Sequence, residues 1–242
     1  MKYSYSSLSK IGLKRKTNED SIGVYQDENG LLVIVCDGLG GNNAGDVASK
    51  LTVEVIHENF LNSSENDYLE KIKNAILEAN RVVLEKAESN FEFKGMATTV
   101  EVLFLKENEV YWGHVGDSRM YFYRNGKLKQ LTKDHSLVQK LIDEGFLTLK
   151  EAENHPNKNI IIRALGDSAN LEVDLSKLRF NNNDDVTFFV CTDGVTSVLN
   201  DNELEQFLKQ PEPVKISSGL SELIEQRGAP DNYSFVIICK NK

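Results

Sequence analysis

Two Asn-Gly dipeptides, each set between two strand-like runs, constrain the fold of this chain most. The runs are residues 21–26 and 31–36 around Asn29-Gly30, and residues 120–124 and 127–131 around Asn125-Gly126. Asn-Gly favours the two-residue hairpin turn, because both of its residues adopt a positive φ readily. Strands joined by such turns are antiparallel. The sequence therefore predicts antiparallel sheets rather than strand–helix–strand units around a parallel sheet.

Hydrophobic periodicity predicts the remaining elements. Further strand-like apolar runs span residues 98–105, 110–115, 186–191 and 233–239. Val47, Leu51 and Val55 recur four residues apart, which predicts a helix over 44–60 with Asn43 as its N-cap. Other helices are predicted over residues 67–89, 136–145, 148–154 and 201–209, and around residues 216–224.

We expect a single domain that spans residues 1–242. No linker rich in Pro, Gly or Ser divides the chain, and 40% apolar with 27% charged residues is an ordinary globular composition. Residues 132–170 hold two short predicted helices and the polar stretch 153–159. We expect this segment to form a mobile flap over the body, and an ordinary helical connection is the alternative.

Charge and apolar content exclude several classes of partner. The 28 Lys and Arg residues against 37 Asp and Glu residues give a net charge of −9, and nucleic acid binding requires clustered cations instead. The longest clean apolar run, residues 31–36, has six residues, whereas a membrane span needs about 20. The N-terminus lacks the apolar core of a secretory signal.

The three cysteines, Cys36, Cys191 and Cys239, are far apart and odd in number. We therefore expect buried free thiols rather than a disulfide or a zinc site. Free thiols indicate a reducing, cytoplasmic setting.

Acidic residues stand at the ends of several predicted strands. Asp37-Gly38 follows one apolar run, and Asp193-Gly194 follows another through Thr192. Taken singly, an Asp-Gly pair more often marks a turn than a site. Three more strand-end positions are acidic, namely Glu19-Asp20, Asp117 and Asp231.

Carboxylates that converge in this way repel one another unless cations neutralise them. Oxygen ligands select hard ions, and the chain has neither an HExxH nor a CxxC motif for zinc, so Mg²⁺ or Mn²⁺ is expected. Several carboxylates around one bridging aspartate suit a two-metal site, which activates water and clamps a phosphoryl oxygen. The pattern favours hydrolysis of a phosphate ester.

The substrate phosphate needs a cation of its own. Arg15 lies five residues before Asp20, and its guanidinium matches phosphate in a bidentate manner. The alternative is that residues 14–16, Lys-Arg-Lys, form a solvated basic patch.

Eight ordered segments resemble the motifs of metal-dependent serine/threonine protein phosphatases, the type 2C or PPM family, in its bacterial form. They are residues 12–20, 35–41 with the continuation 44–49, 95–99, 116–119, 131–136, 163–166, 192–194 and 231–232. The resemblance implies an α+β fold, a four-layer α-β-β-α sandwich with two central antiparallel sheets flanked by helix pairs. It implies a protein-serine/threonine phosphatase that uses a binuclear Mn²⁺ or Mg²⁺ centre and metal-activated water, with residues 132–170 as the flap.

The resemblance also implies roles for individual residues. The implied metal ligands are six carboxylates and one backbone carbonyl: Glu19, Asp20, Asp37, Gly38, Asp117, Asp193 and Asp231. Asp37 would bridge two ions, Glu19 and Asp20 would act mostly through metal-bound water, and Asp117 with Asp193 would support a third ion. Arg15 would bind the phosphate, and Asn232 would support the ligands from behind.

Leu39 departs from the pattern of animal members, which carry a histidine there as a proposed general acid. Bacterial members often have an apolar residue at this position, so Leu39 does not indicate inactivity. The alternatives to a protein phosphatase are a phosphoprotein-binding module that is catalytically weak or inactive, and a hydrolase of small phosphoesters. Asp37, Asp193 and Asp231 are all retained, which favours an enzyme, because a carboxylate cluster is costly without ions.

The expected partners are phosphorylated proteins, including substrates of a eukaryote-like Ser/Thr kinase, and the expected state is a monomer. The four histidines are not expected to take part in catalysis. His57 is interpreted as solvated, His114 as structural, and His155 as part of a polar loop. His135 is interpreted as structural, with contact to the substrate as the alternative. Trp112 is expected in the core or as a cover over a sheet face.

Overall fold

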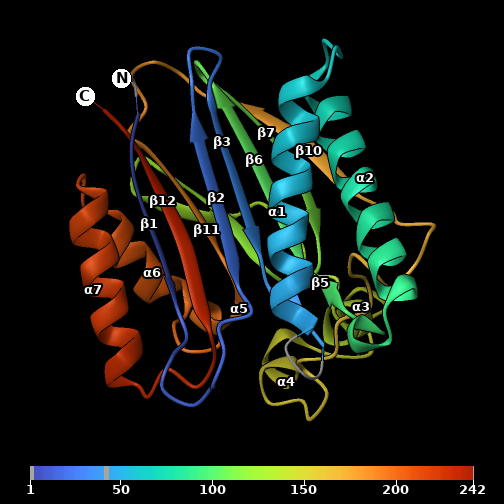
Figure 1. Cartoon of the computed structure of the whole chain (residues 1–242). Coiled ribbons are helices and arrows are strands. Elements are labelled where there is room, and N and C mark those ends of the chain that lie inside the picture. Colours follow the sequence, from blue (N-terminus) through green and yellow to red (C-terminus); the bar gives the residue numbers. More distant parts are fainter. Residues whose placement is uncertain (1–2, 41–43, 242) are drawn as a thin grey trace.

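Two five-stranded antiparallel sheets lie face to face at the centre of the computed structural model, which describes residues 3–40 and 44–241 (Figure 1). The first sheet has the order β1 (Tyr3–Lys10), β12 (Tyr233–Lys240), β11 (Val186–Cys191), β8 (Arg119–Arg124) and β9 (Lys127–Gln130). The second has the order β10 (Asp174–Arg179), β7 (Glu109–Val115), β6 (Val100–Lys106), β3 (Leu31–Cys36) and β2 (Ser21–Gln26). A short pair, β4 (Gly38–Leu39) and β5 (Ala97–Thr98), extends beyond β3.

Both predicted Asn-Gly hairpins are present, and every strand pair is antiparallel, as the sequence predicted. Residues 27–30, which end in Asn29-Gly30, join β2 to β3 in a four-residue connection rather than the predicted two-residue turn, and Asn125-Gly126 alone joins β8 to β9. Asn125 and Gly126 have φ angles of 49° and 91°, which is the conformation that this dipeptide tolerates.

The apolar core fills three layers of space, one between the sheets and one outside each sheet. Along β3, Leu31, Val33 and Val35 face the other sheet. The alternate residues Leu32, Ile34 and Cys36 face the helices that cover the second sheet. A strand buried on both faces must be apolar throughout, which explains the uninterrupted run that the sequence displays.

Helices cover both outer faces, so the chain forms the expected four-layer α-β-β-α sandwich (Figure 1). The second sheet is covered by α1 (Ala44–Asn62) and α2 (Tyr68–Ser89), and a 3₁₀ turn, η1 (Phe91–Phe93), follows α2. The first sheet is covered by α5 (Asp193–Thr196), α6 (Asp201–Leu208) and α7 (Pro213–Gln226). Within the described ranges, no helix combines the length and apolar content that crossing a membrane requires.

The buried face of α1 differs from the predicted one. Val47, Leu51 and Val55 are only half-buried, whereas the fully buried stripe contains Ala48, Thr52 and Ile56. The small side chains of this stripe are hard to recognise from hydrophobic periodicity, because Thr and Ala contribute little to it. The predicted N-cap, Asn43, lies outside the described residues.

The predicted flap contains α3 (Leu137–Asp143) and α4 (Leu149–Glu153), which lie at the same end of the molecule as the start of α1 (Figure 1). Thr148 and Glu151 form a capping box that begins α4. Isolated bridges from Ser136 to Ile161 and from Thr98 to Leu165 close the segment and join it to β5. Cys36, Cys191 and Cys239 are buried free thiols, as predicted.

Candidate metal centre

The two Asp-Gly pairs come from different sheets and meet at one end of the sandwich. Asp37 follows β3 of the second sheet, and Asp193, the first residue of α5, follows β11 of the first. The two carboxyl groups lie close enough for each to shift the pKa of the other. Burial raises the pKa of Asp37 well above its usual range, and the charges of Asp20, Asp193 and Asp117 raise it further. Four predicted ligands therefore lie close enough to disfavour one another's charge.

Hydrogen bonds from β5 fix the backbone of Asp37. Its amide donates to Thr99 Oγ1 over 3.0 Å, and its carbonyl accepts from Thr98 Oγ1 and from the Thr99 amide, each over 2.9 Å. Both threonines belong to the segment 95–99, for which the sequence predicts no role. Their hydroxyls hold the Asp37 turn in place, which a sequence pattern alone does not reveal.

Gly38 is packed against the loop that carries Glu19 and against the start of α1. Its amide donates to the Glu19 carbonyl over 3.2 Å. A Cβ atom at position 38 would lie 2.2 Å from the Gly45 carbonyl oxygen, so only glycine fits. Ser49 Oγ donates to the same Glu19 carbonyl over 2.5 Å. The loop 15–20 is thereby fixed next to Asp37.

Asp20 is almost completely buried. Its Oδ2 accepts from Thr192 Oγ1 over 2.9 Å, which joins the loop before β2 to the end of β11. Burial raises the pKa of Asp20 to about 7, although hydrogen bonds from Ser234 and Thr192 act in the opposite direction. Glu19 is half-buried, and burial raises the pKa of its carboxyl as well.

Asn232 holds the loop of Glu19 against the first sheet. Its Nδ2 donates to the carbonyls of Ile11 and Thr17 over 2.8 and 2.9 Å. Its Oδ1 accepts from the Glu19 amide over 2.9 Å. One side chain therefore fixes three points of residues 11–19 relative to Asp231, consistent with the supporting role predicted for it.

Asp117 approaches the group from the loop between β7 and β8. It is 8% exposed, and its Oδ1 is buried without a hydrogen-bond partner among the described residues. Burial raises the pKa of its carboxyl to about 7, and the charge of Asp193 is the next cause. An unpartnered buried carboxylate oxygen is costly, and a cation would satisfy it.

Arg15 forms an ion pair at the rim of this group. Its Nη2 lies 2.6 Å from Asp231 Oδ2, with the two side chains 51% and 31% exposed. The neighbouring Lys14 and Lys16 are exposed. Arg15 is thus the member of the basic run that contacts the acidic group, which distinguishes it from a residue of a purely solvated patch.

The donor set fits hard divalent cations. It consists of oxygen atoms from buried or half-buried acidic residues, which raise one another's pKa values, and such ligands prefer Mg²⁺ or Mn²⁺. Within residues 3–40 and 44–241, no three His, Cys, Asp or Glu side chains already form a closed ligand group. The fit therefore rests on the mutual charge effects and on the unpartnered oxygen of Asp117.

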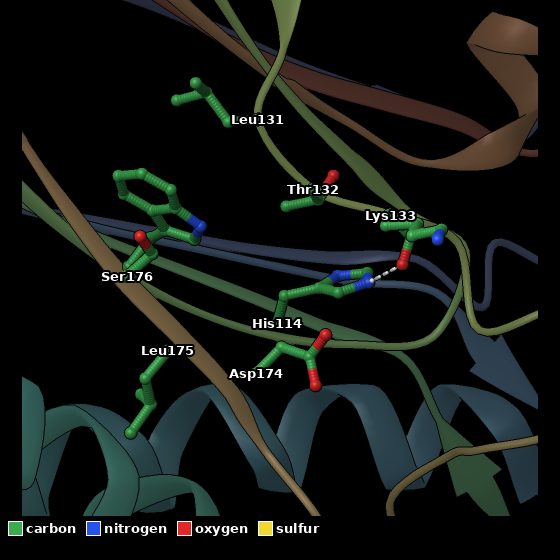
Figure 2. A pocket seen from close by; sticks show the side chains of 8 residues that line it. His114, Leu131, Thr132, Lys133, Asp174, Leu175 and Ser176 are labelled. Atoms are coloured by element: carbon green, nitrogen blue, oxygen red, sulfur yellow. Dashed lines mark hydrogen bonds between the residues drawn. The ribbon is translucent and has the colours of Figure 1, made fainter.

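A separate pocket of about 360 Å³ lies between β7, β10 and the segment that follows β9 (Figure 2). Its lining includes Trp112, His114, Lys133 and Asp174. None of the predicted site residues lines it. Trp112 is buried, as predicted.

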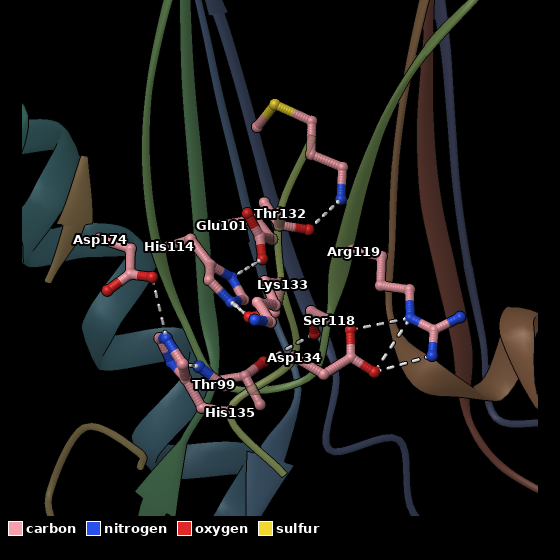
Figure 3. A network of polar contacts seen from close by, with 12 residues as sticks. Thr99, Glu101, His114, Ser118, Arg119, Thr132, Lys133, Asp134, His135 and Asp174 are labelled. Atoms are coloured by element: carbon pink, nitrogen blue, oxygen red, sulfur yellow. Dashed lines mark hydrogen bonds and ion pairs between the residues drawn. The ribbon is translucent and has the colours of Figure 1, made fainter. Parts of the chain in front are cut away.

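The histidines occupy structural positions. His114 and His135 are buried in a polar network beside this pocket (Figure 3). His155 Nδ1 accepts from the Asn157 amide inside the flap. The interpretation of His57 as simply solvated was wrong, because its ring is half-buried and stacks on Tyr25 with centroids 3.5 Å apart.

The raised pKa values predict that the metal-free protein becomes less stable as the pH rises from 6 to 8. A carboxyl with a higher pKa in the folded than in the unfolded state binds more protons when folded. Its stability contribution is therefore complete below about pH 4 and is lost as the pH rises through the folded-state pKa. Asp20, Asp117 and Glu101, each raised to about 7, together lower the free energy of unfolding between pH 6 and pH 8 by roughly 4 kcal/mol.

His135 changes the stability in the opposite direction, because burial lowers its pKa to about 4. The folded state is therefore destabilised below about pH 6.5, and this cost disappears as the pH rises. We expect a net loss of about 3 kcal/mol between pH 6 and 8, measured by urea denaturation in EDTA. Saturating Mn²⁺ should flatten the slope, since a bound cation keeps the carboxylates ionised. A metal-free stability that rises with pH over this interval would contradict the assignment.

Comparison with known proteins finds relatives that match most of the chain. A family model described as protein phosphatase 2C matches residues 14–223. The serine/threonine phosphatase stp of Listeria monocytogenes is 38% identical over 203 residues, which cover 82% of this chain and 80% of that protein. The serine/threonine protein phosphatase PstP of Mycobacterium tuberculosis is 33% identical over 234 residues, which cover 96% of this chain and 44% of that longer protein.

Solved structures agree with these matches. The crystal structure of the serine/threonine phosphatase PstP from Mycobacterium tuberculosis superimposes with a TM-score of 0.90 at 32% identity, covering 99% of both chains. The PstP catalytic domain in complex with two manganese ions gives a TM-score of 0.86 at 32% identity, again covering 99% of both chains.

Proposed function

Since this chain belongs to the protein phosphatase 2C family and is a metal-dependent serine/threonine protein phosphatase, we propose that it hydrolyses phosphoserine and phosphothreonine at the acidic group that joins the ends of β3 and β11. The observation that carries the proposal is the convergence of Asp20, Asp37, Asp117 and Asp193, whose carboxyl pKa values are all raised by burial and by the charges of neighbouring acidic residues. A buried acidic group of this kind requires cations.

The proposed metal ligands are the six carboxylates and one carbonyl named from the sequence, Glu19, Asp20, Asp37, Gly38, Asp117, Asp193 and Asp231. Divalent ions bound there would supply an acidified water and a positive counter-charge for the phosphoryl group. We propose two ions in the main site and a third beside Asp117 and Asp193, with either Mn²⁺ or Mg²⁺ in these places.

The chain's own residues would orient the reacting groups. Asp37 stands between the two sheets, fixed by Thr98 and Thr99, and would bridge the main pair of ions. Thr192 bonds to Asp20, and Asn232 bonds to the backbone of Glu19. These bonds would keep both acidic residues in place relative to Asp37. Leu39 is half-buried in β4 and offers no proton, so the departing serine or threonine oxygen would take its proton from solvent.

We further propose that residues 1–242 act as one catalytic domain and as a monomer in the cytoplasm. The substrates would be phosphorylated proteins, including those modified by a eukaryote-like Ser/Thr kinase. The net charge of −9 makes nucleic acid an unsuitable partner.

The direct test is phosphate release from a phosphothreonine peptide, compared with a small aryl phosphate, in Mn²⁺, in Mg²⁺ and in EDTA. We expect turnover that requires a divalent ion and that is abolished by EDTA. A folded protein that releases no phosphate in either metal would overturn the proposal and favour a binding module instead. Equal turnover of every phosphoester without regard to the peptide would favour a small-molecule hydrolase.

Replacement of Arg15 tests the phosphate-binding role. We expect Arg15→Ala to lower kcat/KM for the phosphothreonine peptide by roughly 10- to 100-fold, the effect of losing a charge-assisted contact to phosphate. Because the variant also frees Asp231 from its ion pair, Mn²⁺ should bind at least as tightly as in the wild type. Lys16→Ala is the matched control, since Lys16 is exposed in the same basic run. An equal effect of both substitutions would indicate only a diffuse basic patch.

A further inference from the structure

Glu101 and His114 form a buried ionisable pair that the reaction described above does not use. They are cross-strand neighbours on β6 and β7, with 0% and 1% of their surfaces exposed. By strand alternation, Glu101 shares the face of Leu103 and Leu105, and His114 shares the face of Trp112, so both lie at the end of the core between the sheets. Burying such a pair in an apolar core rarely adds stability, which calls for another reason for its presence.

The contacts of the pair require a proton between the two side chains. His114 Nε2 lies 2.9 Å from the Lys133 carbonyl oxygen, which only accepts, so Nε2 carries a hydrogen. The other ring nitrogen, Nδ1, is hydrogen-bonded to Glu101 Oε1. Burial raises the pKa of Glu101 to about 7, and the Glu101 carboxylate raises that of His114 against the effect of burial. The pair thus retains one proton and fixes the ring with Nε2–H aimed at Lys133.

The Lys133 carbonyl belongs to a short segment, residues 132–135, that runs beside the loop of Asp117 and that we call the strap (Figure 3). Each of its four residues is fixed by a polar contact with that loop or the adjoining strands. Thr132 Oγ1 accepts from the Met120 amide, Lys133 accepts from His114, Asp134 binds Arg119 through both oxygens, and His135 exchanges two hydrogen bonds with Gly116.

The strap forms the first four residues of the flap and connects the Asp117 loop to the rest of it. His135 Nδ1 accepts from the Gly116 amide over 3.0 Å, directly before Asp117 in the chain. His135 Nε2 lies 3.0 Å from Arg163 Nη1 and 3.3 Å from Asp174 Oδ2. The next residue, Ser136, is the N-cap of α3. A displacement of the strap would therefore move both the flap and Asp117.

At Thr132 and Lys133, close packing does not hold the strap on its His114 side, although the rings of His114 and His135 pack with centroids 4.5 Å apart. The pocket of Figure 2 lies there, with Thr132, Lys133 and His114 in its lining. A segment beside a hollow keeps its position through directional hydrogen bonds, because few van der Waals contacts oppose its movement. Two contacts reach the strap from the strands of the second sheet, the bond from His114 to the Lys133 carbonyl and the contact of Asp174 with His135, and only the first is made to the backbone of the strap.

We propose that Glu101 and His114 are positioning residues for the phosphatase reaction, which fix the strap through the Lys133 carbonyl and thereby place Asp117 and the start of the flap. This inference rests on the proposed function, because Asp117 matters to the reaction only as a ligand of the metal centre. Neither residue touches substrate or metal. The prediction is that the hydrogen bond to Lys133, rather than the charge of the pair, is what the site requires.

Three variants separate these contributions. Glu101→Leu with His114→Phe replaces the pair by apolar residues, which buried pairs commonly tolerate, and removes the donor to Lys133. Glu101→Gln keeps that donor, because the new amide can donate to Nδ1 of a neutral His114 whose Nε2 remains protonated. Thr132→Val leaves the pair intact and loosens the strap at Met120 only.

The experiment measures amide hydrogen exchange in the metal-free chain, together with kcat, KM and the Mn²⁺ concentration for half-maximal turnover of the phosphothreonine peptide. For the double variant we expect an unchanged or higher thermal midpoint and exchange at least about tenfold faster at Gly116, Met120 and His135. We expect kcat at least about tenfold lower, with a higher Mn²⁺ requirement. In Glu101→Gln, the exchange rates and kcat should both stay within about threefold of the wild type. In Thr132→Val, the exchange rates and kcat should both change in the direction seen for the double variant.

Two results would overturn the proposal. One is wild-type exchange and kcat in the double variant or in Thr132→Val. The other is a Glu101→Gln variant as impaired as the double variant, which would make the charge the essential feature. Should the double variant fail to fold, Thr132→Val and Glu101→Gln decide the question. A wild-type chain that hydrolyses nothing would refute the proposed function alone, because the exchange measurements would still report on the strap.

Discussion

Asp37→Asn is expected to lower metal-dependent hydrolysis of a phosphothreonine peptide by about 10³-fold or more, equivalent to at least about 4 kcal/mol of lost transition-state stabilisation. The charges of Asp20, Asp193 and Asp117 all raise the pKa of Asp37. Asp37 therefore occupies the centre of the acidic group, where an amide cannot bridge two cations. The loss should appear in kcat at saturating Mn²⁺ and should not be recovered by more metal.

The same substitution should stabilise the metal-free protein. An uncharged amide at position 37 removes a buried group that its acidic neighbours repel, so we expect the thermal midpoint in EDTA at pH 8 to rise by roughly 3–6 °C. The gain that Mn²⁺ gives the wild type should largely disappear in the variant. Asp167→Asn is the matched control, because Asp167 is exposed in the flap. Activity within tenfold of the wild type, with Mn²⁺ stabilisation preserved, would exclude Asp37 as the bridging ligand.

The sequence predicted the central strands well because their burial dictates their composition. β3, β11 and β12 are covered on both faces, and such strands must be apolar throughout. Two edge strands, β1 and β10, were missed. Apart from Tyr3, their residues are half-buried or exposed, and an edge strand gains its stability from pairing with a distant neighbour, such as β1 with β12, rather than from its own pattern.

The acidic residues of the site were predictable because each stands where an apolar run ends. The polar residues that hold them were not. Thr192 bonds to Asp20, which lies 172 positions away, and Asn232 bonds to Thr17, 215 positions away. Likewise, the ion pair of Arg15 with Asp231 spans 216 positions. These contacts depend on how the two sheets pack against each other. Neither the spacing nor the type of the residues along the chain reveals that packing.

The Glu101–His114 pair illustrates the same limit in a different way. Each residue interrupts an apolar strand, and His114 alone was expected to be a satisfied structural histidine, as it is. Its partner was not recognised, because the register between β6 and β7 decides which residue faces it. A buried acid in a strand between apolar neighbours is the pattern that could have revealed the pair.

Gly194→Ala should be the most destabilising single methyl addition near the metal centre. A Cβ atom at position 194 would lie 1.8 Å from the Asn232 carbonyl oxygen. The obstacle is backbone, so no side chain can move aside. The start of α5 and the start of β12 would have to separate, and this separation would pull Asp193 away from Asp231.

We expect this substitution to lower the free energy of unfolding by about 3 kcal/mol or more, which corresponds to a fall in thermal midpoint of roughly 6–12 °C. Mn²⁺ should stabilise the variant less than the wild type at equal concentration, because the ligands on either side of the contact are spread. Gly219→Ala in α7 is the matched control. Its Cβ would meet the ring edge of Phe207, a side chain that can rotate, and alanine favours the helix by about 1 kcal/mol. The control should therefore stay within about 1 kcal/mol of the wild type. Equal stability of the two variants would mean that the approach of α5 to Asn232 is looser than the structure shows, and that the distance between Asp193 and Asp231 is set elsewhere.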